Sequence, residues 1–180
     1  MDEAPRAFGI LNQEVKQRIA KGTGVVKKGA PRVMISVAHF SDPSIMRMME
    51  NMGLSIPVTL FGLLVSKGRE KTPFISGEVL ANQEMLGGMF HSNYGFIKST
   101  ADVAREANID GIVWNYLFNC RPLSQPSHLL KEFVERETGI PVLSLETDIY
   151  DSRTYSTEAL RMRVETFAEI LRVRKESVNI

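Results

Sequence analysis

Cys120 is the only cysteine among the 180 residues of this chain, and its thiol is the side chain best suited to chemistry. A single thiol cannot form a disulfide within the chain, nor can it build a metal site from cysteines of this chain alone. It can act as a nucleophile, as one ligand of a site that other groups complete, or as a small buried apolar side chain. The neighbouring residues bear on which of these roles applies.

Cys120 follows the apolar and β-branched run Asp110–Phe118, which begins with a turn pair and is typical of a strand buried on both faces. The thiol is therefore expected just beyond the carboxyl end of that strand. In open parallel sheets, ligands bind in the crevice outside the carboxyl ends of the strands, and this favours a functional role for the thiol. Asn119, Arg121 and Ser124 share its loop and are candidates to line a pocket there.

Other candidate groups are few and open to two interpretations. His39 follows the first expected strand, so it belongs to the same sheet edge and could contact a substrate or pair with Cys120, although a plain loop histidine fits equally well. Glu146, Asp148 and Asp151 come at the end of the last expected strand. These carboxylates could bind a metal ion or shape a pocket, yet carboxylates in a polar loop are usually only solvated.

Composition excludes several classes of protein. With 43% hydrophobic and 24% charged residues, the chain matches a soluble globular protein. Lys and Arg number 22 against 21 Asp and Glu, which gives no electrostatic case for binding nucleic acid. The longest apolar stretch, residues 56–65, is about half the length needed to cross a bilayer. The amino-terminal residues lack the pattern of an export signal, so we expect a cytoplasmic protein without membrane contact.

The elements that must position these residues alternate between helical and strand periodicity. Residues 66–99 are rich in glycine and proline and predict loops with one short helix over 78–86. Alternating strands and helices predict an α/β fold, with a mainly parallel four-stranded sheet and helices on both faces, Rossmann-like or flavodoxin-like, as one domain over residues 1–180. Helices are expected over 9–20, 43–53 with Asp42 as cap, 100–107, 128–137 with Ser127 as cap and from a cap at Ser156, and strands over 32–38, 58–64, 110–118 and 140–146.

Several of these segments resemble one known family. Residues 108–173 resemble the C-terminal region of the 2-hydroxyacyl-CoA dehydratase and benzoyl-CoA reductase family, and residues 24–34, with a GxGVV turn, a basic loop and a PRVMIS strand, resemble the start of its last domain. The segments that carry the resemblance are Asp-Gly-Ile-Val at 110–113, Cys-Arg-Pro at 120–122, the run from Gly139 to Arg153 and the run from Leu160 to Glu169.

The resemblance implies a subunit that holds a 4Fe-4S iron–sulfur cluster beside a bound acyl-CoA. In the family, this cluster adds one electron to the thioester carbonyl, giving a ketyl radical anion from which hydroxide leaves, or it reduces an aromatic ring. Cys120 matches the family's C-terminal cluster cysteine, and thiolates are the ligands that such clusters require. The resemblance also implies a second related subunit and an ATP-dependent activator as electron donor.

The chain departs from the family in its number of cysteines. The family's other cluster cysteines belong to an N-terminal domain that we expect to be absent here, and Phe61–Leu64 stands where a cysteine-bearing motif is often found. Because one thiolate cannot hold a four-iron cluster, a partner polypeptide would have to carry that domain. The alternatives are a cluster-free structural or interaction subunit of the same fold, and a small-molecule binding module or cysteine-nucleophile enzyme. Alone, the chain is expected to be colourless and inactive, as a fragment or subunit of a lyase or CoA-ester reductase.

Overall fold

The computed structural model describes residues 3–35, 40, 43–60, 93–148, 151, 153 and 155–178, and it divides into two compact units, Met1–Ala30 and Pro31–Ile180. In the first unit, α1 spans Glu3–Lys21 and none of its residues is buried. The helix ends at Gly22, whose backbone is left-handed with φ of 65° and whose N–H donates to the Ile19 carbonyl. A glycine adopts this conformation without the penalty of a Cβ, so it stops the helix close to the predicted end at residue 20. The helix begins at Glu3, earlier than the predicted residue 9.

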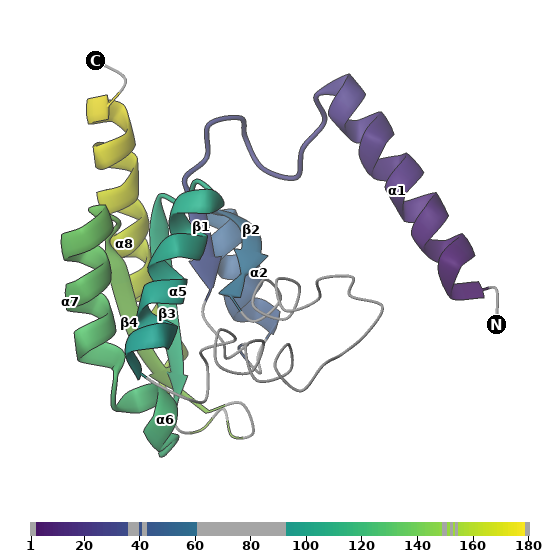
Figure 1. The fold of residues 1–180 in the computed structure, drawn as a ribbon. Coiled ribbons are helices and arrows are strands. Elements are labelled where there is room, and N and C mark those ends of the chain that lie inside the picture. Colours follow the sequence, from purple (N-terminus) through teal and green to yellow (C-terminus); the bar gives the residue numbers. More distant parts are fainter. Residues whose placement is uncertain are drawn as a thin grey trace. The chain divides into compact units, whose positions relative to one another are not determined.

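The second unit is built on one parallel sheet of four strands. They are β1 (Arg32–Ile35), β2 (Ser55–Thr59), β3 (Gly111–Leu117) and β4 (Val142–Thr147), and they lie in the order β2-β1-β3-β4 (Figure 1). The predicted α/β class and the parallel four-stranded sheet are confirmed. This order corresponds to the flavodoxin-like arrangement, in which β1 and β3 are central neighbours. The chain adds β2 on the outer side of β1, and it then adds β4 on the outer side of β3. The sheet therefore has a topological switch point between β1 and β3.

Helices cover both faces of this sheet (Figure 1). One face packs against α2 (Pro43–Asn51) and α8 (Thr157–Val178), and the other packs against α5 (Asn93–Glu106) and α7 (Ser127–Thr138). Successive residues of β3 alternate between the two cores, because Val113 joins the α2 and α8 side while Ile112 and Trp114 join the other. This double burial explains the continuous apolar run that predicts β3.

The second strand lies earlier in the chain than the sequence predicts. It begins at Ser55 rather than at residue 58, and Pro57 lies inside it. Among the described strands β2 lies at the edge of the sheet, and its pairing with β1 is irregular between Arg32 and Met34. An edge strand with a bulge tolerates a proline, which has no N–H to give to a ladder. Residues 61–64 and the short helix expected over 78–86 lie outside the described residues.

Helix α5 also begins earlier than expected, at Asn93 instead of residue 100. Its first turns bury Phe96 and Ile97 against the sheet, and the apolar contact outweighs the cost of Gly95 in the first turn. Tertiary packing of this kind is absent from a local pattern, so the helix start was predicted wrongly.

The capping predictions had mixed outcomes. The Ala159 N–H donates to Ser156 Oγ at 3.3 Å, so Ser156 caps α8 as predicted. Ser127 does not cap α7, because Pro126 occupies the cap position and the Ser127 hydroxyl donates to the Ser124 carbonyl at 2.7 Å. Gly139 ends α7 in a left-handed conformation, close to the predicted end of this helix at residue 137. Within the described part of the chain, no helix has the length and apolarity that crossing a membrane requires.

Candidate functional site

The turn after β3 places Cys120 at the carboxyl edge of the sheet, as the sequence predicts. β3 ends at Leu117, and the Cys120 N–H donates back to the Leu117 carbonyl at 3.1 Å, which closes a tight turn over Phe118 and Asn119. Asn119 has a φ of 57°. Asparagine accepts this left-handed conformation better than most residues with a Cβ, so the residue type suits the turn. The thiol thus follows directly from the strand that borders the switch point.

Cys120 is also the cap residue of α6 (Arg121–Ser124), a short helix that the sequence did not predict. The Cys120 carbonyl accepts hydrogen bonds from the N–H groups of Leu123 at 3.0 Å and Ser124 at 2.9 Å. The backbone of Cys120 is therefore held from both sides, by β3 through its N–H and by α6 through its carbonyl. Its side chain makes no capping hydrogen bond and the residue is half-buried. Cys120 is thus partly exposed while its backbone is held in place.

A buried polar pair lies immediately before this turn. The Thr147 hydroxyl of β4 donates to Asn115 Oδ1 of β3 at 2.8 Å, and both residues are at least 98% buried. The Phe118 N–H donates to the Thr147 carbonyl at 2.8 Å. Together these bonds tie the carboxyl ends of β3 and β4 to each other. The sequence signal for this pair is Asn115 itself, a polar residue inside an otherwise apolar run.

Four of the five residues predicted to form the site lie together. Asn119, Cys120, Arg121 and Ser124 occupy the turn and α6, with Asn119 and Arg121 exposed and Ser124 half-buried. The fifth, His39, lies outside the described residues. The structure thus presents one thiol with a cationic and two polar neighbours on a short segment.

The acidic residues after β4, Asp148 and Asp151, form hydrogen bonds with each other and with Arg153. The Asp151 N–H donates to Asp148 Oδ1 at 3.3 Å, and the Asp151 carboxylate accepts two hydrogen bonds from the Arg153 guanidinium at 2.8 and 2.7 Å. The side-chain hydrogen bonds from Arg153 lower the pKa of Asp151. Across the described residues, no group of three or more His, Cys, Asp or Glu is placed to hold a metal ion. The described residues therefore do not support the metal site that the carboxylates after β4 could have formed.

Tyr116 is a titratable residue near this edge that was not among the predicted site residues. It is half-buried on β3, directly across from Glu146 in the pairing of β3 with β4. Burial raises the pKa of the Tyr116 hydroxyl, and the negative charge of Glu146 raises it further, while Arg163 acts in the opposite direction. Tyr116 is therefore held in its neutral form, as a hydroxyl able to donate or accept a hydrogen bond.

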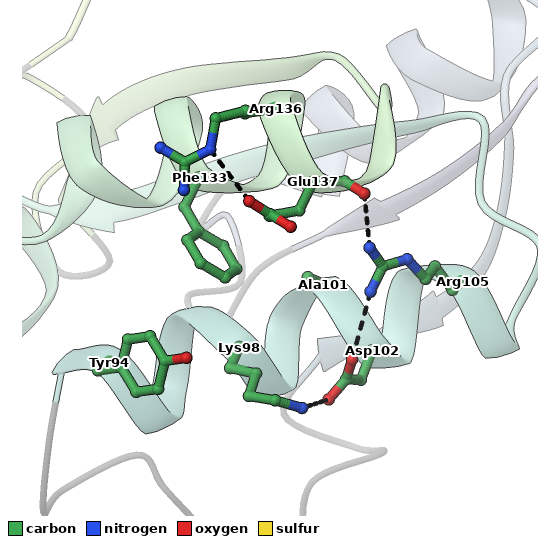
Figure 2. A pocket seen from close by; sticks show the side chains of 8 residues that line it. All are labelled: Tyr94, Lys98, Ala101, Asp102, Arg105, Phe133, Arg136 and Glu137. Atoms are coloured by element: carbon green, nitrogen blue, oxygen red, sulfur yellow. Dashed lines mark hydrogen bonds and ion pairs between the residues drawn. The ribbon is translucent and has the colours of Figure 1, made fainter.

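A groove between α5 and α7 encloses about 470 Å³ (Figure 2). Its aromatic part is the edge-to-face pair of Tyr94 and Phe133, with ring centroids 6.1 Å apart. Its charges are compensated by ion pairs, because Lys98 contacts Asp102 at 2.7 Å and Arg136 contacts Glu137 at 3.0 Å. The hydrogen bond to Asp102 raises the pKa of Lys98.

A smaller cavity of about 310 Å³ lies at the opposite, amino edge of the sheet. There the Asp110 carboxylate accepts from the Lys175 ammonium at 2.6 Å and from the Arg32 N–H at 2.7 Å. These bonds join α8 to the starts of β1 and β3, which is a structural role. Neither this cavity nor the groove is lined by any of the predicted site residues.

Comparison with known proteins adds two findings. A family model described as 2-hydroxyglutaryl-CoA dehydratase, D-component, matches residues 1–171. The chain is also 25% identical over 75 residues to a benzoyl-CoA reductase polypeptide of Thauera aromatica. That similarity covers 42% of this chain and 17% of the relative, so it spans less than a fifth of the relative's length.

Proposed function

The chain belongs to the 2-hydroxyglutaryl-CoA dehydratase D-component family, and from this premise we propose that it is part of an enzyme subunit acting on an acyl-CoA thioester. Within that subunit, Cys120 supplies one thiolate ligand to a 4Fe-4S iron–sulfur cluster. The reaction is either a dehydration, which would make the enzyme a lyase, or a reduction of a CoA ester. The weak similarity to a benzoyl-CoA reductase polypeptide is consistent with either chemistry.

The observation that carries this proposal is the position of Cys120. Its thiol lies at the carboxyl end of β3, beside the switch point where doubly wound sheets bind ligands. The residue is half-buried and its backbone is held by hydrogen bonds to Leu117, Leu123 and Ser124. A cluster ligand needs this combination, because the sulfur must reach a group outside the chain while the strand keeps it in place.

The cysteine content of the chain allows it to supply one thiolate ligand to a cluster and no more. Iron–sulfur clusters of this type bind four thiolates, and no second cysteine exists in the chain. When bound, the cluster would supply single electrons to the acyl-CoA. Cys120 would hold one of its irons, and the exposed Arg121 guanidinium and the Ser124 hydroxyl are the nearest groups of this segment that could adjust the polarity around the sulfur.

The remaining ligands of such a cluster would come from outside these 180 residues. We propose that a polypeptide carrying the family's N-terminal domain supplies the other thiolates, and that a second related subunit and an ATP-dependent activator complete the system. An acyl-CoA would be the substrate. A reducing cytoplasm suits a site of this kind, since thiolates must remain free to bind iron.

The lone cysteine supports a second candidate as well. A subunit of the same fold that has lost the cluster would keep the sheet and its partner contacts and would need no further thiolate. In that case Cys120 is a half-buried side chain of the turn, and its substitution has only a small structural effect.

Anaerobic co-expression of the chain with the polypeptide encoded beside it separates the two candidates. The readouts are iron and sulfide per complex and the visible charge-transfer absorption of a cluster. We expect a coloured complex that loses iron with Cys120→Ala and keeps it with Ser124→Ala, a control in the same segment. A complex that forms but stays colourless, or whose iron content is the same with Cys120→Ala, would refute the cluster proposal and support the cluster-free subunit.

A further inference from the structure

β4 lies at one edge of the four described strands, so one side of its backbone points away from β3. Two hydrogen bonds fix which side faces β3. The Pro141 carbonyl accepts from the Ile112 N–H at 3.0 Å, and the Thr147 carbonyl accepts from the Phe118 N–H at 2.8 Å. Backbone groups of successive strand residues point alternately to the two sides of a strand. The backbone groups that point away from β3 therefore belong to Val142, Ser144 and Glu146.

Both outward backbone groups of Val142 are occupied by side chains of α7. The Val142 N–H donates to Glu135 Oε1 at 2.9 Å, and the Lys131 ammonium donates to the Val142 carbonyl at 2.7 Å. Lys131 and Glu135 are four residues apart on the helix and also form an ion pair with each other. The carboxylate and the ammonium thus take the places that a carbonyl and an N–H of a neighbouring strand would occupy.

A second helix reaches the same edge from the other face of the sheet. Arg163 of α8 donates from Nη2 to the Ser144 carbonyl at 2.6 Å. α7 and α8 pack on opposite faces of the sheet, one on each side of β4 (Figure 1). Side chains from both helices therefore occupy backbone groups of two consecutive outward residues, Val142 and Ser144.

We propose that these three side chains, Lys131, Glu135 and Arg163, form an edge shield that prevents β4 from pairing with a strand of a second copy of the chain. An unpaired strand edge is a template for strand addition, and natural sheets block such edges with charged side chains, prolines and irregular pairing. This inference does not depend on the proposed enzymatic function.

The two edges of the described sheet differ in how they are protected. β2, at the other edge, contains Pro57 and has an irregular register with β1. β4 contains no proline and pairs with β3 in a continuous register from Val142 to Thr147. A regular strand of this kind would accept a further strand readily, so its protection depends on the edge shield.

Amide hydrogen exchange tests the edge shield at Val142. Glu135→Ala removes the acceptor of the Val142 N–H, so this amide should exchange about fivefold faster, as expected for the loss of one ordinary hydrogen bond. Glu135→Gln keeps a side-chain carbonyl oxygen and should retain slow exchange. Glu132→Ala is the matched control, because Glu132 is an exposed glutamate of the same helix. Unchanged exchange in Glu135→Ala, or equal acceleration in Glu132→Ala, would overturn the proposal.

Sedimentation velocity over a series of concentrations tests the consequence for association. The double variant Glu135→Ala/Arg163→Ala frees outward backbone groups without changing the net charge. We expect its weight-average sedimentation coefficient to rise with concentration more steeply than that of the wild-type chain. Pairing along the edge should also make the outward N–H of Ser144 exchange more slowly at high concentration than at low concentration.

The matched control for association is Glu132→Ala/Arg161→Ala, which removes the same residue types from the same two helices. Arg161 pairs with Glu158 and Glu165 on its own helix. This control should sediment like the wild-type chain. If the Glu135→Ala/Arg163→Ala variant also sediments like the wild-type chain, or if the control associates equally, the edge shield does not prevent strand pairing and the proposal is wrong.

Discussion

Replacing Thr147 with valine should loosen the edge of the sheet that carries the candidate site. The Thr147 hydroxyl donates to Asn115 Oδ1 at 2.8 Å, and neither residue is more than 2% exposed. Valine has nearly the shape of threonine, so the substitution removes the hydrogen-bond donor while leaving almost no cavity. Removing one partner of a buried hydrogen bond costs about 1–3 kcal/mol of unfolding free energy.

The measurement is urea-induced unfolding followed by the fluorescence of Trp114, the single tryptophan, which is fully buried in the sheet. For a small domain the unfolding free energy falls by about 1–3 kcal/mol per molar urea, so the expected loss shifts the midpoint by roughly 1 M. Because Cys120 is the only cysteine, its rate of labelling by a thiol reagent reports the adjoining turn specifically. We expect the labelling rate to rise in the Thr147→Val variant.

Thr100→Val is the matched control. Thr100 is also completely buried, but its hydroxyl donates to the Phe96 carbonyl four residues earlier in the same helix, at 2.9 Å. That carbonyl belongs to the hydrogen-bond ladder of α5, so it keeps its backbone partner when the hydroxyl is lost, and stability should change by only about 0.5 kcal/mol. Equal destabilisation by the two valine substitutions would refute the reasoning. The reasoning would also be refuted if the losses of unfolding free energy from Thr147→Val and Asn115→Ala were fully additive in the double variant. Two residues that share a hydrogen bond should show a coupling energy of about 0.5–3 kcal/mol.

Two further predictions concern β3. A Cβ at Gly111 would lie 2.8 Å from Leu171 Cδ2, so Gly111→Ala should lower the free energy of unfolding in urea by about 1–3 kcal/mol. Shortening Leu171 to alanine in the same chain should recover part of this loss. If Gly111→Ala leaves the unfolding free energy unchanged, the steric argument is wrong. Because the pKa of Tyr116 is raised, the stability it contributes is complete below the ordinary tyrosine value of about 10 and is lost as pH rises through the folded-state pKa. Ultraviolet titration should show a late-ionising tyrosine that disappears in Tyr116→Phe and ionises earlier in Glu146→Gln, and unchanged titration curves would refute the assignment.

The sequence predicted the sheet well because strands buried on both faces differ so clearly from amphipathic helices. β3 is apolar over its whole length since both faces lie under helices, and this pattern is visible without tertiary information. β2 was misplaced because Pro57 looks like a strand boundary. Only the strand order shows that β2 lies at the edge of the described sheet, where a proline is tolerated, and strand order cannot be read from local periodicity.

The site was predictable in its position but not in its geometry. Cys120 was expected beyond the carboxyl end of a strand, and the structure confirms this. The hydrogen bond between Asn115 and Thr147 joins residues 32 positions apart, so it depends on the register of β3 against β4. Likewise, Tyr116 gains its raised pKa from burial and from Glu146, both of which arise only when the strands pair. Local sequence places a residue, whereas its chemical environment is set by distant segments.

The placement of Cys120 explains how one cysteine could take part in a site shared between polypeptides. A thiol in the core would be enclosed by its own chain and could not reach ligands on another. At the switch point, the chain leaves β1 and β3 in opposite directions, so a residue in the turn after β3 lies at an open edge. The backbone of Cys120 is nevertheless fixed through Leu117 and Ser124, and this lowers the entropy that binding must overcome. Assembly would cover this half-buried residue and so protect from oxidation the thiol that the proposed cluster needs.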